Sequence, residues 1–287
     1  MTAQKYSLRP LIELLFSTAL WGLGFPATAW ILKNLDPASN LFYRLQFCFW
    51  LSAGIILLSK HKGLFNLANL RLGLIPGFFL GLNLLLQTVG LQYTSPTKSA
   101  FITVLYVVMV PIIELAFHRQ YISKKLLIAI LGALIGVYFV SQIQDFNLNI
   151  GDVLTLLCAL AAAFQIYFVG KISRKSNAAF TLNAFQSLVA SVLMVPFMFF
   201  EDKTNLMSLD TGGWLAFVLT VVGGSMIAFY LQIKAQQQIS ASTAGVLFLL
   251  ESPFAFLFSF MIFGETLTLS QLLGCILILV SCTYAIL

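Results

Sequence analysis

Residues 241–262 read ASTAGVLFLLESPFAFLFSFMI, a stretch that holds a single charged residue, Glu251. About 20 consecutive apolar residues in a helix cross the roughly 30 Å hydrocarbon core of a bilayer. The whole chain has this character: 60% of its 287 residues are hydrophobic, 9% are charged, and the mean hydropathy is +0.95. A water-soluble domain has about 25% charged residues. The composition therefore predicts an integral membrane protein and leaves no room for a soluble catalytic domain.

Ten apolar stretches of this kind follow one another along the chain. They must be helices, because a backbone in lipid has to satisfy its hydrogen bonds internally and the alternation of a membrane β-barrel is absent. The predicted spans are 11–32, 40–59, 71–93, 98–118, 124–142, 150–171, 178–200, 212–233, 241–262 and 267–286. The first span carries Glu13 and continues past any small-residue cleavage site, so we expect a membrane helix there and not a signal peptide.

The positive charges predict the orientation of these spans. When the loops are sorted by alternating sides, the 16 Lys and Arg residues divide twelve to four in favour of the side that carries both termini. Lys and Arg accumulate in cytoplasmic loops. We therefore expect a multi-pass protein of the bacterial inner (plasma) membrane with both termini in the cytoplasm. The net charge of +6 then reflects orientation, and no nucleic-acid partner is expected.

The second half of the chain repeats the first at an offset of 142 residues, with a gap of about three residues at the loop before the fourth span. The offset lays Pro111 of VVMVPIIE on Pro253 of LLESPFAF, and it lays Arg44 on Gln186. Because each half has five spans, the two halves must insert with opposite orientation, as in many secondary transporters. The sequence thus predicts an all-α membrane protein of two inverted five-helix repeats, residues 1–145 and 146–287.

Four segments carry a resemblance to a known family. They are Trp21-Gly22, Phe42-Tyr43-Arg44, LQYTSPTKSAFITVLYVVMVP at 91–111 and SASTAGVLFLLESPFAFLFSFMIFGE at 240–265. In order and spacing they resemble the drug/metabolite transporter superfamily, in its ten-span EamA type, over essentially the whole chain. The resemblance implies a transporter of small metabolites, often an exporter of amino acids, with a central cavity lined by spans one to four and six to nine. Glu114 departs from the pattern, where an apolar residue is expected.

Glu251 is the most unusual residue of the spans, because it lies near the middle of the ninth one. A charge at this depth costs roughly 2.5–3.5 kcal/mol, so such a residue usually faces a cavity or has a partner. We predict that Glu251 binds the substrate or carries a coupling proton. The alternative is an acid that stabilises the helix break at Pro253, whose ring frees a carbonyl one turn earlier.

Polar side chains also recur at steps of three and four residues in the fourth span, which would place them on one helix face. This stripe consists of Ser99, Thr103, Tyr106, Val110 and Glu114. Thr103 and Tyr106 are expected to line the cavity. Glu114 either joins them or pairs with Arg119 or Lys125 at the membrane surface.

The first span has a corresponding stripe of Glu13, Ser17, Trp21, Gly24 and Thr28. Trp21 lies too deep for the interfacial aromatic belt, so we expect it to line the cavity, with simple helix packing as the alternative. Asn83 and Gln87 in the third span and Tyr167 in the sixth are further candidates. The two amides could instead hold helices together, at about 0.6 kcal/mol each.

Arg44 and Lys98 are the cations nearest to the predicted cavity. Both lie close to the outer ends of their spans, where a long side chain can snorkel to the headgroups. Either could instead bind a carboxylate of the substrate, and the planar guanidinium of Arg44 could also pair with Glu251.

Small residues and cysteines in the spans are expected to have structural roles. The glycines at 73, 77 and 81, and those at 132 and 136, are spaced by four and allow close approach of neighbouring helices. The four cysteines lie inside spans without metal-ligand spacing, which is typical of small buried hydrophobic residues.

Together these features predict a secondary active transporter that moves a small organic metabolite such as an amino acid by alternating access, and the family resemblance implies an exporter. Multidrug or lipophilic-cation efflux is the nearest alternative. A passive channel, a scramblase or a non-transporting membrane subunit are alternatives of another class. No nucleotide-binding GxxxxGK, nucleophile elbow or HExxH is present, so an enzyme is not expected. The expected partners are a small-molecule substrate, the lipid bilayer and a coupling proton; no cofactor or metal is expected, and a monomer is compatible with the sequence.

Overall fold

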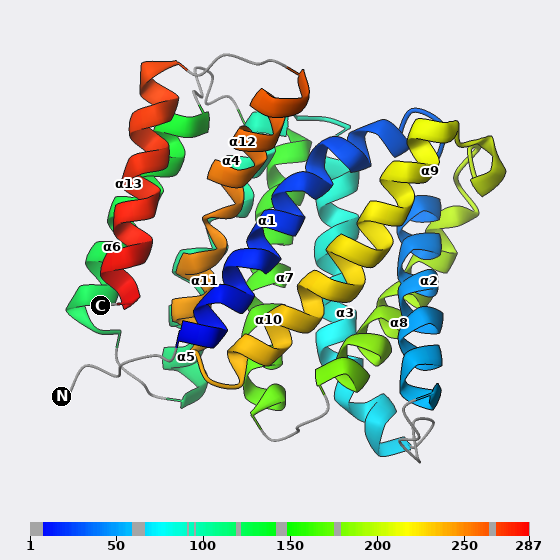
Figure 1. The fold of residues 1–287 in the computed structure, drawn as a ribbon, viewed down its shortest axis with the longest axis horizontal. Helices are drawn as coiled ribbons and strands as arrows, with labels where there is room; N and C mark the ends of the chain where they lie inside the picture. Colours follow the sequence, from blue (N-terminus) through cyan, green and yellow to red (C-terminus); the bar gives the residue numbers. More distant parts are fainter. Residues whose placement is uncertain are drawn as a thin grey trace.

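The computed structural model describes residues 8–58, 67–90, 92–94, 96–118, 122–141, 148–174, 179–263 and 268–286, and every regular element in these ranges is helical (Figure 1). The first half contains α1 (Leu8–Ile31), α2 (Pro37–Leu58), α3 (Leu67–Gly90), α4 (Pro96–Thr103), α5 (Tyr106–His118) and α6 (Lys124–Ser141). The second half contains α7 (Ile150–Ser173), α8 (Ala179–Met198), the short η1 (Leu206–Ser208), α9 (Thr211–Val218), the π-helix η2 (Leu219–Ile227), α10 (Ala228–Gln236), α11 (Ala241–Phe248), α12 (Glu251–Phe263) and α13 (Leu269–Ile286).

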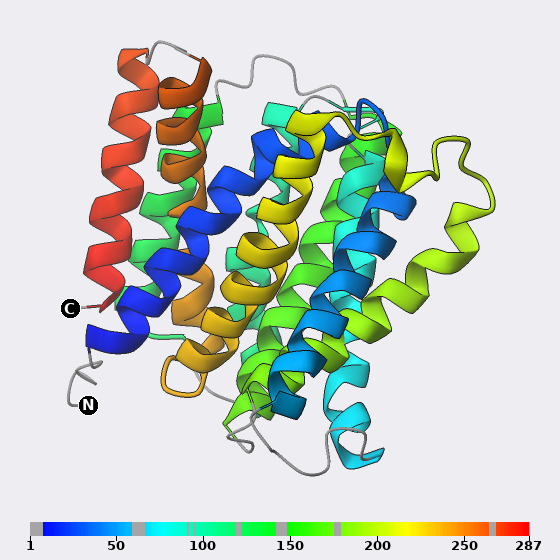
Figure 2. The same cartoon turned by 45° about the vertical axis from the view of Figure 1, so that its right-hand side comes forward.

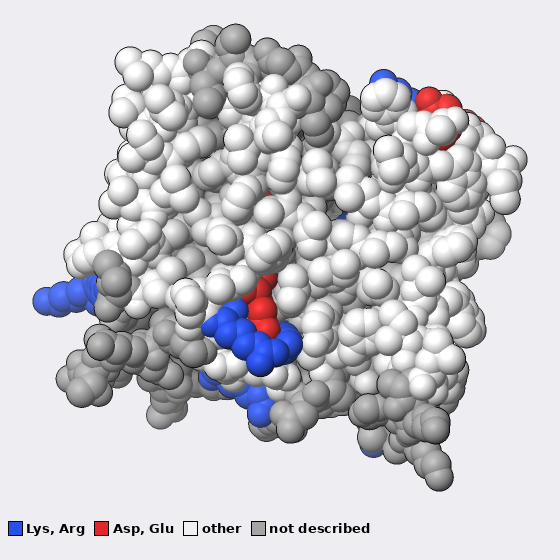
Figure 3. Space-filling view, in the orientation of Figure 1, with Lys and Arg blue, Asp and Glu red and all other residues white. Residues whose placement is uncertain are grey.

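The predicted all-α membrane fold is confirmed. Nine helical stretches among the described residues are long and apolar enough to cross a membrane, and a shorter apolar helix covers residues 101–117. The outer surface is correspondingly apolar: on the face shown in Figure 3, charged side chains occupy a few small patches and most of the surface carries none. Leu58 and Phe200 are more than four-fifths exposed, as expected for side chains that contact lipid or headgroups.

The fourth and ninth spans, which the sequence predicts as continuous helices, are each interrupted. The first is broken between α4 and α5, and the second between α11 and α12. At the second break the N–H of Leu249 and that of Leu250 bond to carbonyls three residues back, as in a tight turn. The ring of Pro253 would clash with the carbonyl of Leu249 in a regular helix, which gives a physical reason for the break at this place.

The helix bounds show how the two halves correspond. α1 and α7 begin 142 residues apart, as do α2 and α8, whereas α4 and α11, α5 and α12, and α6 and α13 begin 145 residues apart. The three-residue gap therefore lies where the sequence indicated, between the second and fourth spans. In this register Tyr106 is the counterpart of Glu251, each being the first residue after its break. The predicted match of Pro111 with Pro253 is wrong, because it ignores the gap.

Helix packing shows the same correspondence. For several packed pairs of helices there is a second pair in which the helices of the two halves have exchanged places. α1 packs along α9, η2 and α10, and α7 packs along α3 in the same way. α3 packs on α8 as η2 packs on α2, while α2 pairs with α8 and α6 with α13. This is the pattern of two inverted repeats related by an axis in the membrane plane.

The start of α1 and the end of α13 lie at the same end of the bundle in Figures 1 and 2. We call this end the terminal side, and the other end the opposite side. An even number of crossings requires this arrangement.

Glycines bring the helices of the two halves close together, as predicted. A Cβ on Gly73 would lie 2.5 Å from Phe185, and one on Gly77 would lie 2.7 Å from the carbonyl oxygen of Gln186, so α3 can approach α8 only without side chains there. Gly136 of α6 meets Gly274 of α13 in a similar way, with the added Cβ 2.8 Å from a carbonyl oxygen. Small-residue faces of this kind are common where membrane helices pack.

Candidate functional site

Two of the predicted site residues, Trp21 and Arg44, converge on the π-helix η2. The indole Nε1 of Trp21 donates to the carbonyl oxygen of Gly224 at 3.1 Å, and Nε of Arg44 donates to Oγ of Ser225 at 2.7 Å. A Cβ on Gly224 would lie 3.0 Å from Nη2 of Arg44, so the guanidinium packs directly on this glycine. Both side chains come from the first half of the chain and contact a backbone segment of the second.

Asn183 of α8 completes this contact, and the sequence analysis did not select it. Its Nδ2 donates to the carbonyl oxygens of Ser225 and Met226, each at 3.1 Å. Three consecutive carbonyls of η2 thus accept hydrogen bonds from side chains of other helices. π-helical turns are rare and frequently mark functional sites. The available signal was the position of Asn183, a polar residue deep in a span and one turn before Gln186, the repeat counterpart of Arg44.

A chain of buried amides extends from Asn183 through the second half. Nε2 of Gln186 donates to Oδ1 of Asn183 at 2.9 Å, Nε2 of Gln165 lies 3.4 Å from Oε1 of Gln186, and Nε2 of Gln232 lies 3.2 Å from Oε1 of Gln165. All four side chains are almost fully buried. Networks of this kind strengthen in a low dielectric and rigidify the helices that carry them, here α7, α8 and α10.

Arg44 adopts neither the outward orientation nor the pair with Glu251 that the sequence analysis offered for it; its predicted role toward a substrate carboxylate stays a prediction. It is 8% exposed, so it is buried in the bundle and does not snorkel outward. Within the described part of the chain no carboxylate lies at ion-pair distance from it, so the predicted pair with Glu251 is absent. Its observed polar partner is a hydroxyl on η2.

Asn83, Gln87 and Thr103 form a second polar group where α3, α4 and α7 meet. Nε2 of Gln87 lies 3.4 Å from Oγ1 of Thr103, and the thiol of Cys158 donates to Oδ1 of Asn83 at 3.1 Å. The side chains of Asn83, Gln87 and Thr103 are only partly buried, although they lie within membrane spans. Polar groups with residual exposure at this depth are typical of the wall of a water-accessible space. Cys158 is buried as predicted, but it also serves as a donor.

Glu251 and Tyr106 each follow a helix break: Glu251 lies where α1 crosses α12, and the buried Tyr106 begins α5, which packs on α7 and α11. A Cβ on Gly22 would lie 3.1 Å from the carbonyl oxygen of Glu251, so the backbones are in close contact at that point. The ring of Trp21 contacts that of Phe248, with centroids 5.3 Å apart, on the other side of the break. Glu251 is partly exposed and occupies the first turn of α12, where a helix dipole stabilises negative charge.

Comparison with known proteins decides what this arrangement belongs to. The model of the EamA-like transporter family matches residues 9–142 and again 149–287. The chain belongs to the EamA-like transporter family. It is similar to an uncharacterized transporter of Archaeoglobus fulgidus, 34% identical over 91% of this chain and 80% of that one, and to the uncharacterized transporter YetK of Bacillus subtilis, 26% identical over 55% and 49%.

A solved crystal structure superposes on this EamA-like transporter with a TM-score of 0.80 over 97% of this chain and 98% of the other, at 16% sequence identity. At that identity the likeness concerns the fold alone. The family match and the names of the relatives show a multi-pass membrane transporter of the drug/metabolite transporter superfamily.

Tyr167, another predicted residue of this EamA-like transporter, does not join the group around Glu251. Tyr167 is buried on α7, with its ring centroid 5.4 Å from that of Phe117 and 5.8 Å from Nζ of Lys171. These contacts place it toward the terminal side, away from the break. The side chain of Lys98 lies outside the described residues, so its predicted role stays a prediction.

The predicted polar stripe of the fourth span is also divided. Oγ of Ser99 lies 3.3 Å from Oγ1 of Thr155 on α7, whereas Glu114 accepts from the backbone N–H of Ser242 on α11 at 3.2 Å and from its hydroxyl. The break after α4 separates the two ends of the stripe, so they face different helices. Of the partners predicted for Glu114, Arg119 lies outside the described residues, and Lys125 is replaced by Ser242.

Proposed function

We propose that this EamA-like transporter is a secondary active transporter that exports a small organic solute from the bacterial cytoplasm by alternating access. The observation that carries the proposal is the position of Glu251. This acid is partly exposed within a span, at a helix break, where α1 of the first half crosses α12 of the second. Secondary transporters built from inverted repeats bind their substrates and ions at such discontinuous helices near the midplane.

The chemistry of the neighbouring residues favours a substrate with an ammonium group. Glu251 supplies a carboxylate, Trp21 an aromatic ring, and Asn83, Gln87 and Thr103 supply neutral hydrogen-bonding groups. A carboxylate beside an aromatic ring suits an organic cation, which is attracted to both. An amino acid would in addition need a cation for its carboxylate, and Arg44 is engaged with Ser225. This observation favours amines and lipophilic cations, the second candidate class, over amino acids.

A thermal-shift screen of the purified protein tests the substrate class. Amino acids, nucleosides, sugars and quaternary amines are compared, because a ligand that binds the folded state stabilises it by RT ln(1 + [L]/Kd). We expect amines to raise the melting temperature of the wild type and not that of Glu251→Gln. Asp202→Asn, a change of an exposed side chain on the opposite side, is the matched control and should respond like the wild type. Equal responses of all three proteins would contradict a role for Glu251 in binding.

Reconstituted vesicles test the transport mechanism with the compound found in this screen. Alternating access predicts saturable uptake and counterflow, whereas a passive channel or scramblase gives neither. If Glu251 also carries the coupling proton, vesicles with Glu251→Gln should not accumulate the compound when a pH gradient is applied. Their rate of uptake should then be the same with and without the gradient. Uptake by Glu251→Gln that equals wild-type uptake with and without the gradient would remove proton coupling.

A further inference from the structure

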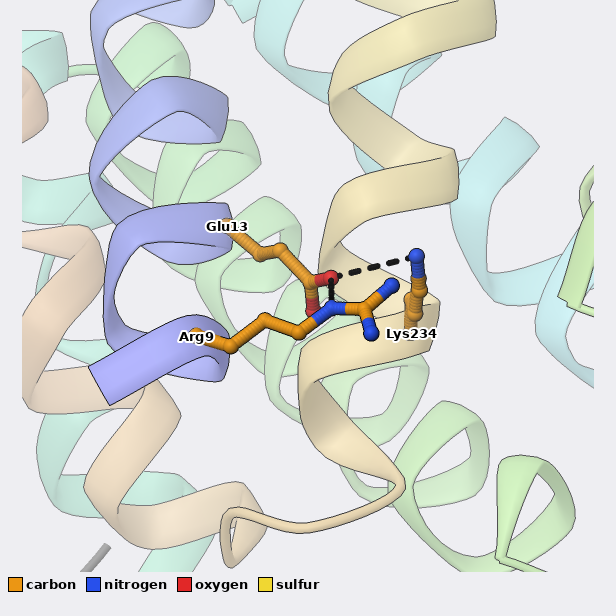
Figure 4. Close-up of polar contacts among 3 residues, drawn as sticks. All are labelled: Arg9, Glu13 and Lys234. Carbon is orange, nitrogen blue, oxygen red and sulfur yellow. Dashed lines mark hydrogen bonds and ion pairs between the residues drawn. The ribbon is translucent and has the colours of Figure 1, made fainter. Parts of the chain in front are cut away.

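Glu13 is held between two cations at the terminal side (Figure 4). Its Oε1 accepts from Nε of Arg9 at 3.1 Å and lies 3.2 Å from Nζ of Lys234. Arg9 belongs to α1 itself, but Lys234 comes from α10, so the second pair joins the two halves of the chain. The Glu13 side chain is only 9% exposed, while that of Arg9 is 71% exposed. The carboxylate is therefore enclosed between α1 and α10, and the side chain of Arg9 covers it from outside. We call this line of contact between α1 and α10 the seam.

Glu114, the second acid of the first half on this side, holds the same region of the second half. Its carboxylate accepts from the backbone N–H and the hydroxyl of Ser242, in the first turn of α11. A carboxylate at this place is favoured by the orphan N–H groups and the dipole of the helix. Lys234 and Ser242 flank the connection between α10 and α11. Two acids of the first half thus bind the 234–242 turn, one at each end.

The contact at Glu13 is the outer end of the seam, which leads to the centre of the bundle. Oγ of Ser17 donates to the carbonyl oxygen of Ala228 at 2.9 Å, and Trp21 donates to that of Gly224. Glu13, Ser17 and Trp21 follow each other at four-residue steps and contact successively earlier residues of α10 and η2. The seam ends at Trp21, beside the break that carries Glu251. While it is closed, α1 and α10 separate the centre from the terminal side.

The equivalent helices on the opposite side are arranged differently. α5 packs against α11 on the terminal side, but their repeat counterparts α12 and α4 are not among the packed pairs of the described chain. Every residue from Glu251 to Phe256 of α12 keeps partial exposure, whereas α11 is buried throughout. Inverted repeats would make the two sides alike if the halves were in the middle of their motion. Here α5 and α11 form a packed pair on the terminal side, whereas α4 and α12 do not form one on the opposite side.

From these contacts we infer that Glu13 with Lys234, and Glu114 with Ser242, form the gate that closes the terminal side and must separate in each transport cycle. The inference rests on the proposed alternating access. Oε2 of Glu13 is buried and has no hydrogen-bond partner among the described contacts. A buried, partly unsatisfied carboxylate gains hydration when the seam opens, which keeps the closed state from being excessively stable. Glu13, Lys234 and Glu114 are positioning residues and need not touch the substrate.

The distance across the seam can be measured without knowing the substrate. Spin labels are attached to Leu8→Cys, 72% exposed on α1, and to Gln238→Cys, exposed in the 234–242 turn, in a Cys275→Ser background. Double electron–electron resonance in proteoliposomes then gives the distribution of distances. The otherwise unchanged protein should be dominated by a short component. Glu13→Gln and Lys234→Gln should each shift the distribution toward longer distances, because each removes the ion pair that joins α1 to α10.

The charge-swapped double variant, Glu13→Lys with Lys234→Glu, should restore the short component of the distance distribution. Restoration would show that the single variants lose the ion pair and are not simply misfolded. Glu201→Gln, on the opposite side, is the matched control and should not lengthen the distance. Unchanged distributions in Glu13→Gln and Lys234→Gln would overturn the inference, as would a swap that behaves like the single variants. The distance measurement needs no solute, so it can succeed even if no transported solute is found. In that case the proposed function would be contradicted while the inference about the gate would stand.

Discussion

At the scale of single residues, Arg44 shows how a charge can be accommodated in the bundle with no carboxylate of the described residues at ion-pair distance. Its guanidinium is enclosed at η2, beside the hydroxyl of Ser225 and the backbone of Gly224. The weakly hydrated, delocalised guanidinium is suited to such a site. The residue therefore stabilises an irregular helix segment that Trp21 and Asn183 also hold, and it links the two halves of the chain.

The pairing of Arg44 with Ser225 can be measured by a double-mutant cycle. Ser225→Ala should lower the free energy of unfolding by about 1.5–3 kcal/mol, since it leaves a buried charged donor without its acceptor. In an Arg44→Met background the same substitution should cost much less. Thermal unfolding of the four purified proteins gives the coupling between the two sites. Additive effects would show that the 2.7 Å contact contributes nothing specific.

At the scale of elements, the sequence predicts most of the helices but not their irregularities. Long apolar runs reveal the spans because bilayer thickness fixes their length. The four-residue spacing of Glu13, Ser17 and Trp21 correctly predicts one polar face, because all three contact α10 or η2. The π-helix depends on partners far away in sequence, whereas the break before Glu251 has a local cause in the ring of Pro253. The sequence shows that Asn183 is a polar residue deep in a span, but it does not identify the two carbonyls of η2 to which Asn183 donates.

The glycine contacts between α3 and α8 lead to a prediction for an element pair. Gly73→Ala should destabilise the protein by about 1–3 kcal/mol, the usual range for overpacking, because its Cβ would lie 2.5 Å from backbone and Cβ atoms of Phe185. Gly54→Ala on α2 is the matched control, since nothing lies within 4 Å of the added atom. The fraction of folded protein that remains after heating in detergent compares the two. Equal losses would show that the close approach is not required.

At the scale of the whole molecule, the exchange of helix pairs between the halves would allow two sites of contact to form the gate that we propose. α1 and α7 hold equivalent places, each along three or more elements of the other half. In the proposed alternating access, a small rotation of one half against the other would open one side while it closes the other, since packed interfaces shift between discrete arrangements. The asymmetry between the α5–α11 pair and the α4–α12 pair is the expected sign of one end state.

The twelve-to-four division of Lys and Arg predicts the orientation of this end state in the membrane, and labelling of single cysteines in intact cells tests that prediction. Met207 and Leu8 are 76% and 72% exposed, the first on the opposite side and the second on the terminal side. In a Cys275→Ser background, a membrane-impermeant maleimide should label Met207→Cys and should reach Leu8→Cys only after the cells are permeabilised. The reverse result would place the termini outside, and the gate at Glu13 would then close the outer entrance instead of the cytoplasmic one. In either orientation the start of α1 and the end of α13 must be labelled from the same side, because an even number of crossings joins them.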